Sequence, residues 1–101
     1  MIDEKLVVKL KEIFEKYKEI EKVILFGSRA RGDNKYNSDI DICIVGAGMM
    51  HLTLANINMD ISEINTPLSF DILSFNELNK EELIKNILKE GVVIYNGKEI
   101  R

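Results

Sequence analysis

Two stretches of the chain decide its fold: VILFGSRARG at residues 23–32 and DIDICIV at residues 39–45. The first begins with a short apolar run that ends at Gly27, which is typical of a strand buried on both faces. In the second, successive side chains point to opposite faces of a strand. The three isoleucines therefore share one face, and the two aspartates share the other with Cys43 and Val45. The sequence predicts two strands joined by a loop that starts at a glycine.

Helices are predicted on both sides of these strands. Apolar residues at helical spacing indicate one helix over residues 3–20, with Asp3 as its N-cap, and a second over residues 50–64. The second helix is expected to stop at the sequence Asn-Thr-Pro of residues 65–67. A last helix is predicted to start at Asn79, an N-cap followed three residues later by a glutamate, and to end before a glycine.

Two further strands complete the pattern. They are predicted over residues 68–73 and 92–95. Strands and helices then follow one another without an internal repeat, which indicates an α/β layer structure. We expect a single domain over residues 1–101, of the α/β class, with a small mixed sheet flanked by helices.

The composition is that of a globular protein and narrows the classes of partner. Hydrophobic residues make up 46% of the 101 residues and charged residues 31%. The net charge of −3 argues against DNA or membrane binding driven by overall charge. Because no signal segment and no apolar run of ~20 residues is found, we expect a cytoplasmic protein without a membrane partner. With one cysteine and one histidine, a metal would have to be held by oxygen ligands.

The loop of residues 27–32 has the features of an anion site. Gly27 lets the chain turn tightly, and the first N–H groups of a starting helical turn, with the Ser28 hydroxyl, can bind phosphate oxygens. Arg29 and Arg31 would add charge-assisted hydrogen bonds. The alternative interpretation is an ordinary strand-to-helix turn with a serine cap and two solvated arginines.

Three aspartates occur in strands that are otherwise apolar. Asp39 and Asp41 lie on one face of their strand with Cα atoms about 6.5–7 Å apart. Carboxylates at this spacing can hold the two Mg²⁺ ions of a phosphoryl-transfer site, which are roughly 3.5–4 Å apart. Asp71 is a third strand acid, whose burial without a partner would be unfavourable. The alternative is that these are solvent-facing strand ends; together with the phosphate loop, they suggest one shared site.

Other features are interpreted as structural. The sequence GAGMMH at residues 46–51 begins like a dinucleotide-binding fingerprint, but His51 stands where the third glycine is needed. His51 is expected to be a surface or capping residue. Cys43 has no histidine or second thiol nearby to activate it, so a packed core thiol is expected. The core is also expected to contain three methionines: Met49, Met50 and Met59.

The spacing of these motifs resembles a known family. Gly27-Ser28, ten intervening residues, Asp39-Ile40-Asp41 and a later strand aspartate are similar to the nucleotidyltransferase superfamily of DNA polymerase β. The string from GSRARG to SDID most resembles the minimal nucleotidyltransferases, short proteins often paired with a helical HEPN partner as antitoxin and toxin. The resemblance implies the nucleotidyltransferase fold.

The resemblance also implies roles for individual residues. The catalytic and metal-binding residues would be Asp39, Asp41 and Asp71. The residues that contact the nucleotide would be Gly27, Ser28, Arg31 and Ser38. Two Mg²⁺ ions would be the cofactors and ATP the substrate.

The function implied is transfer of AMP from ATP to a hydroxyl, with a tyrosine of a HEPN toxin as the expected acceptor. No direct DNA binding is expected. Two alternatives remain open. The chain could be a non-catalytic antitoxin that neutralises its partner by binding. It could also modify a small molecule, as the aminoglycoside-modifying relatives do, although those larger members use a second domain.

Overall fold

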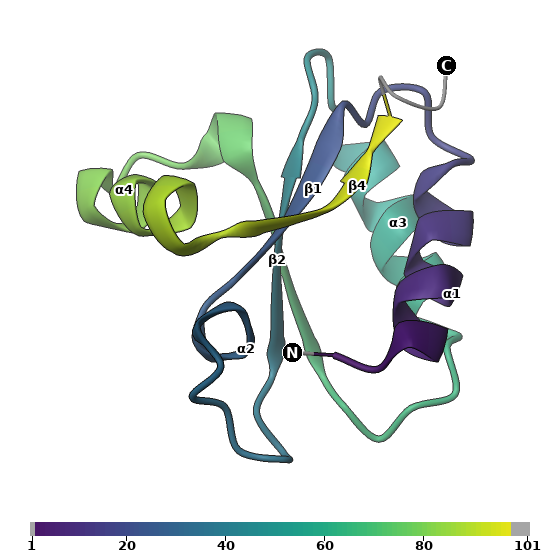
Figure 1. Cartoon of the computed structure of the whole chain (residues 1–101). Coiled ribbons are helices and arrows are strands. Elements are labelled where there is room, and N and C mark those ends of the chain that lie inside the picture. Colours follow the sequence, from purple (N-terminus) through teal and green to yellow (C-terminus); the bar gives the residue numbers. More distant parts are fainter. Residues whose placement is uncertain (1, 98–101) are drawn as a thin grey trace.

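The computed structural model describes residues 2–97, and its centre is a four-stranded sheet (Figure 1). Strand β1 (Lys22–Phe26) pairs antiparallel with both β2 (Ile40–Val45) and β4 (Val92–Asn96). Strand β3 (Phe70–Ser74) pairs parallel with β2, which gives the strand order β3-β2-β1-β4. The small mixed sheet expected from the sequence is confirmed.

Helices cover both faces of this sheet. Helices α1 (Glu4–Phe14) and α3 (His51–Ser62) lie on one face, and α4 (Glu81–Glu90) lies on the other (Figure 1). The 3₁₀ turn η1 (Phe75–Glu77) follows β3 and packs on the α4 side. The single-turn helix α2 (Ser28–Arg31) comes directly after β1. Within the described part of the chain, no helix combines the length and apolar character needed to cross a membrane.

The alternation along β2 divides the core in two. Ile40, Ile42 and Ile44 are fully buried in the larger cluster, against α1 and α3. Cys43 points to the other face and joins the smaller cluster, which includes Ile87 of α4. Burial in that cluster raises the pKa of the Cys43 thiol to about 11. The expectation of a packed core thiol is therefore confirmed.

Helix α1 ends at Phe14, although the helical pattern predicts a helix as far as residue 20. The N–H groups of Lys16 and Tyr17 bond three residues back, to the carbonyls of Ile13 and Phe14, both at 3.1 Å. These tighter turns carry the chain to Ile20, which is fully buried. The apolar spacing thus continues beyond the helix because the following turns also face the core.

The predicted N-cap of the last helix is wrong. Lys80, not Asn79, precedes α4, and it makes no side-chain hydrogen bond to the helix start. Glu81 and Glu82 instead place negative charge in the first turn, which is favourable at a helix N-terminus. The surface position expected for His51 is confirmed, since its side chain is exposed and its Nδ1 lies 3.4 Å from Oε1 of a glutamate of η1.

Two of the three methionines expected in the core lie on the surface. Met50 and Met59 are 69% and 64% exposed. The buried face of α3 is set by Ile57 and Ile61, and Met59 lies two residues from each, about 200° around the helix. Only Met49 packs against the core, where it is partly buried.

A polar contact ties the turn after α1 to α3. The Tyr17 hydroxyl donates a hydrogen bond to Asp60 Oδ2, and Lys16 Nζ lies 3.0 Å from the same oxygen. Desolvation and this hydrogen bond raise the pKa of Tyr17 to about 12. The hydrogen bonds from Tyr17 and Lys16 lower the pKa of Asp60. Both shifts mean that the contact is strongest with a neutral phenol and an ionised carboxylate.

Tyr17→Phe should therefore change the pH dependence of stability at both ends of the scale. In the folded wild type the pKa of Tyr17 is raised to about 12, from a value near 10 in the unfolded chain. The contribution of Tyr17 to the free energy of unfolding is therefore lost as pH rises from about 10 through about 12. The contribution of Asp60 to the free energy of unfolding is lost as pH falls below about 4, because the pKa of Asp60 is lower in the folded than in the unfolded chain. Urea unfolding across pH should show a difference between the two proteins that is largest near pH 7. A difference that stays constant from pH 3 to 12 would contradict this assignment.

Candidate active site

Two carboxylates meet where β2 and β3 lie side by side. Asp41 is directly opposite Asp71 in the parallel register of these strands. Neighbouring strands are about 4.8 Å apart, and paired residues of a parallel ladder point to the same face. This is the face opposite the buried isoleucines of β2. The sheet therefore presents both carboxylates side by side at one end.

The third carboxylate comes from the residue before β2. Asp39 is two positions ahead of Asp41, and the N–H of the intervening Ile40 already bonds to the Ser69 carbonyl at 2.9 Å. Asp39 and Asp71 are exposed, and Asp41 is partly buried. Within the described residues 2–97, Asp39 and Asp71 are therefore open to a ligand.

The electrostatics of Asp41 show that the acidic groups act on one another. Its pKa is raised, first by desolvation and then by repulsion from Asp71 and Asp39. The positive charge of Arg31 opposes this shift. Three like charges at one place are unfavourable unless a cation neutralises them. The cluster is therefore suited to a cationic ligand.

Gly27 forms the sharp turn between β1 and α2. Its φ of +74° and ψ of −157° lie in a region that only glycine adopts readily. A Cβ on Gly27 would overlap the Asp41 carboxylate, with Oδ2 as the closest atom. The backbone therefore passes directly beside Asp41. The turn predicted as an anion site and the predicted carboxylates lie together, with Ser28 at the start of α2.

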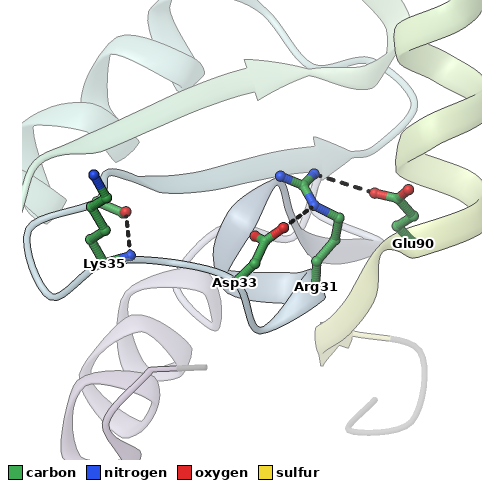
Figure 2. Close-up of polar contacts among 5 residues, drawn as sticks. Arg31, Asp33, Lys35 and Glu90 are labelled. Carbon is green, nitrogen blue, oxygen red and sulfur yellow. Dashed lines mark hydrogen bonds and ion pairs between the residues drawn. The ribbon is translucent and has the colours of Figure 1, made fainter.

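Arg31 ends α2 next to this cluster. Its Nε donates to Asp33 Oδ2 at 3.1 Å and its Nη1 to Glu90 Oε2 of α4 at 3.4 Å (Figure 2). These two partners raise the pKa of Arg31, and its side chain is 43% exposed. These exposed contacts hold the guanidinium where its charge lowers the pKa of Asp41; they contribute little to stability and can be exchanged for a ligand.

Arg29 is buried, whereas the alternative interpretation of the loop predicts a solvated side chain. Only 6% of the residue is exposed. Its Nε and Nη2 donate to the Ser38 carbonyl at 3.0 and 2.8 Å, and Nη2 also donates to the Tyr36 carbonyl at 3.2 Å. This role could not be predicted from the sequence, because no local pattern indicates which loop carbonyls a nearby arginine will reach.

Ser38 closes the turn that leads into β2. Its Oγ accepts a hydrogen bond from the Lys35 N–H at 2.9 Å, and its own N–H donates to the Lys35 carbonyl at 3.1 Å. A serine hydroxyl that accepts still has its own proton to donate. Ser38 can therefore hold the turn and contact a ligand that reaches Asp39.

The acidic cluster fits magnesium as part of a larger ligand set. In residues 2–97, no group of three acidic, histidine or cysteine side chains is arranged to hold a metal ion by itself. Mg²⁺ is usually bound by one or two carboxylates together with phosphate oxygens and water, rather than by an all-protein cage. The oxygen donors Asp39, Asp41 and Asp71 beside a glycine turn match that pattern of binding.

Comparison with protein families gives a match over nearly the whole chain. Residues 8–100 match the model of the family described as "Polymerase beta, Nucleotidyltransferase". The chain is also similar to a curated protein of Methanocaldococcus jannaschii named "Putative protein adenylyltransferase". The two are 35% identical over 79 residues, which cover 75% of this chain and 79% of the relative.

Solved structures share the fold. A nucleotidyltransferase structure from Sulfolobus solfataricus, described as putative, is 28% identical, with a TM-score of 0.56 over 94% of this chain and 84% of that one. A toxin–antitoxin structure with AMP-PNP has a TM-score of 0.71 at 18% identity, over 98% and 77% of the two chains. The structure of tri-AMPylated Shewanella oneidensis HEPN toxin with MNT antitoxin has a TM-score of 0.70 at 13% identity, over 98% and 76%.

The contact between Gly27 and Asp41 can be tested by a pair of glycine variants. Gly48 also has a positive φ, of +75°, but a Cβ there meets nothing within 4 Å. Gly48→Ala should therefore lower the free energy of unfolding only by the backbone strain, about 1–2 kcal/mol. Gly27→Ala should lower it by more, because its φ/ψ lies in a region that is nearly restricted to glycine and because the new methyl group also displaces the Asp41 carboxylate. Urea unfolding measures both, and equal losses would contradict the close approach.

Proposed function

Because the chain belongs to the polymerase β nucleotidyltransferase family, we propose that it transfers AMP from ATP to a hydroxyl group of a partner protein. One observation carries this proposal: Asp41 and Asp71 are paired in register, directly beside the turn at Gly27. The curated relative from Methanocaldococcus jannaschii supports the choice of AMP and of a protein acceptor, since it is named as a protein adenylyltransferase.

The residues of the site have separate tasks in this reaction. Asp39 and Asp41, with Asp71, would hold Mg²⁺, which when bound neutralises charge on the triphosphate. Gly27 makes the tight turn that brings the start of α2 beside Asp41, where the Ser28 hydroxyl can donate to phosphate oxygens. Ser38 and Arg31 can do the same from the loop and from the end of α2. Electrostatic stabilisation of the phosphates is the main task of such a site.

In this proposal, Asp71 receives the proton of the acceptor hydroxyl. The acceptor hydroxyl oxygen forms a bond to the α-phosphorus, the bond from this phosphorus to pyrophosphate breaks, and the hydroxyl proton passes to the Asp71 carboxylate. Asp71 fits this role because it is exposed on the edge strand β3, whereas Asp41 is partly buried. A side chain from a second protein can therefore reach it.

The partner that fits best is a HEPN toxin, with a tyrosine as the acceptor. The structural neighbours include a toxin–antitoxin complex with AMP-PNP and an AMPylated HEPN toxin with MNT antitoxin. The openness of the acidic cluster supports a protein acceptor rather than a small molecule enclosed by the chain. In this role the chain is an antitoxin that acts by modifying its partner.

Mass measurement of both proteins tests this function. The chain is incubated with Mg²⁺, each nucleoside triphosphate in turn, and the protein encoded beside it. We expect the partner to gain the mass of one or more AMP units, with ATP as the preferred substrate. An unmodified partner in a tight complex would contradict the proposal and favour an antitoxin that acts by binding alone.

Asp41→Asn should separate catalysis from folding. Removing a charge from a repulsive cluster should leave the melting temperature unchanged or raise it. Transfer should fall about 100-fold or more, because even residues that only orient metal ligands matter 10- to 100-fold. Glu12→Gln, which removes an exposed charge from α1, is the control and should keep full activity. Loss of the fold in Asp41→Asn would instead give Asp41 a structural role.

A further inference from the structure

The three carboxylates are not held in place in the same way. Asp41 and Asp71 lie inside β2 and β3, where the ladder of the sheet fixes their backbone. Asp39 precedes β2, at the end of the irregular segment 33–39. The position of Asp39 therefore depends on whatever holds this segment, and the strands alone do not determine it.

Arg29 makes the hydrogen bonds that hold the end of this segment. Its guanidinium donates to the carbonyls of Tyr36 and Ser38, the second of which belongs to the peptide bond leading into Asp39. Because only 6% of Arg29 is exposed, these hydrogen bonds are shielded from water. The side chain starts from α2, the same turn that begins at Gly27. Arg29 thus connects the proposed phosphate turn to the peptide bond before Asp39.

We propose that Arg29 is a positioning residue for the transfer reaction: by binding the carbonyls of residues 36 and 38, it sets where Asp39 presents its carboxylate to the metal. This inference rests on the proposed function. Arg29 acts through the backbone and needs no contact with the nucleotide. Its hydrogen bonds to the carbonyls of residues 36 and 38 face the loop, whereas the side chain of Arg31, two residues later, is 43% exposed.

The geometry explains why this residue is an arginine. The planar guanidinium donates from two nitrogens in a fixed orientation, which lets it hold two carbonyls of one turn at the same time. A lysine keeps the charge and the long apolar stem but offers a single nitrogen without fixed geometry. Arg29→Lys therefore removes the simultaneous hydrogen bonds to the carbonyls of residues 36 and 38, while it preserves the charge.

Amide hydrogen exchange of the full chain tests whether the hydrogen bonds of Arg29 hold the turn of residues 36–38. The Ser38 amide reports on the turn, and the amides of Ile42 and Ile44 report on the paired part of β2. In Arg29→Lys we expect exchange at Ser38 to be about 5- to 10-fold faster, the factor that corresponds to losing one hydrogen bond. Exchange at Ile42 and Ile44 should be unchanged. If the Ser38 amide of Arg29→Lys exchanged at the same rate as in the wild type, the proposal would be overturned.

Binding of Mn²⁺ in the presence of AMP-PNP tests the consequence for Asp39. Electron paramagnetic resonance measures the fraction of free Mn²⁺ without requiring any turnover. We expect Arg29→Lys to weaken Mn²⁺ binding about 10- to 100-fold, as is typical when a residue that orients metal ligands is changed. The control is Ile57→Val, a core variant of α3 that lowers stability without touching the loop. It should bind Mn²⁺ like the wild type.

The outcomes separate the two proposals. Unchanged Mn²⁺ affinity in Arg29→Lys, or an equal loss in Ile57→Val, would show that Arg29 only stabilises the fold and would overturn the inference. If the wild type binds Mn²⁺ with AMP-PNP, and Arg29→Lys weakens it, the inference stands even when no AMP transfer is found and the proposed function fails. A wild type that binds no Mn²⁺ would overturn both.

Discussion

The site depends on one constraint: the parallel register that places Asp41 opposite Asp71, with the backbone of Gly27 against the same carboxylate. Each part of this arrangement requires the others. A residue with a Cβ at position 27 would displace Asp41, and a shift of β3 by one residue would turn Asp71 to the buried face. The larger cluster, built on the isoleucines of β2, holds this register from the opposite side of the sheet.

The end of the sheet that carries Asp41 and Asp71 contains unfavourable interactions that the rest of the sheet does not have. Burial, and then repulsion from Asp71 and Asp39, raises the pKa of Asp41. Elsewhere β2 is apolar and, apart from the partly buried Val45, fully within the core, with Cys43 packed against Ile87 of α4. Concentrating unfavourable charge at one open end, while the rest of the strand forms the core, is characteristic of a site prepared for a cation and an anionic substrate.

Much of the fold follows from local patterns. The alternation of residues 39–45 correctly separates the core face from the acidic face, and the glycine after the apolar run of β1 correctly marks the turn. Sequence could not supply the pairing of β2 with β3, because strand order depends on contacts between distant residues. The pattern also overestimates the length of α1, since the turns after Phe14 keep the apolar spacing of a helix. It assigns Met50 and Met59 to the core, although both side chains are exposed and the buried face of α3 is formed by other residues.

The candidate site could be predicted as a set of residues, but the way they are held could not. The three aspartates and Gly27 stand out because acids are unusual in apolar strands and because a glycine ends one of them. Arg29 carries no such signal, and only the folded loop shows that it binds the carbonyls of residues 36 and 38. A crystal structure with Mg²⁺ and a non-hydrolysable ATP analogue tests the central claim most directly. We expect the triphosphate against Gly27 and Ser28, with metal bound by Asp39 and Asp41 and facing Asp71. A nucleotide bound on another surface, or a metal that contacts none of these carboxylates, would contradict the proposed site.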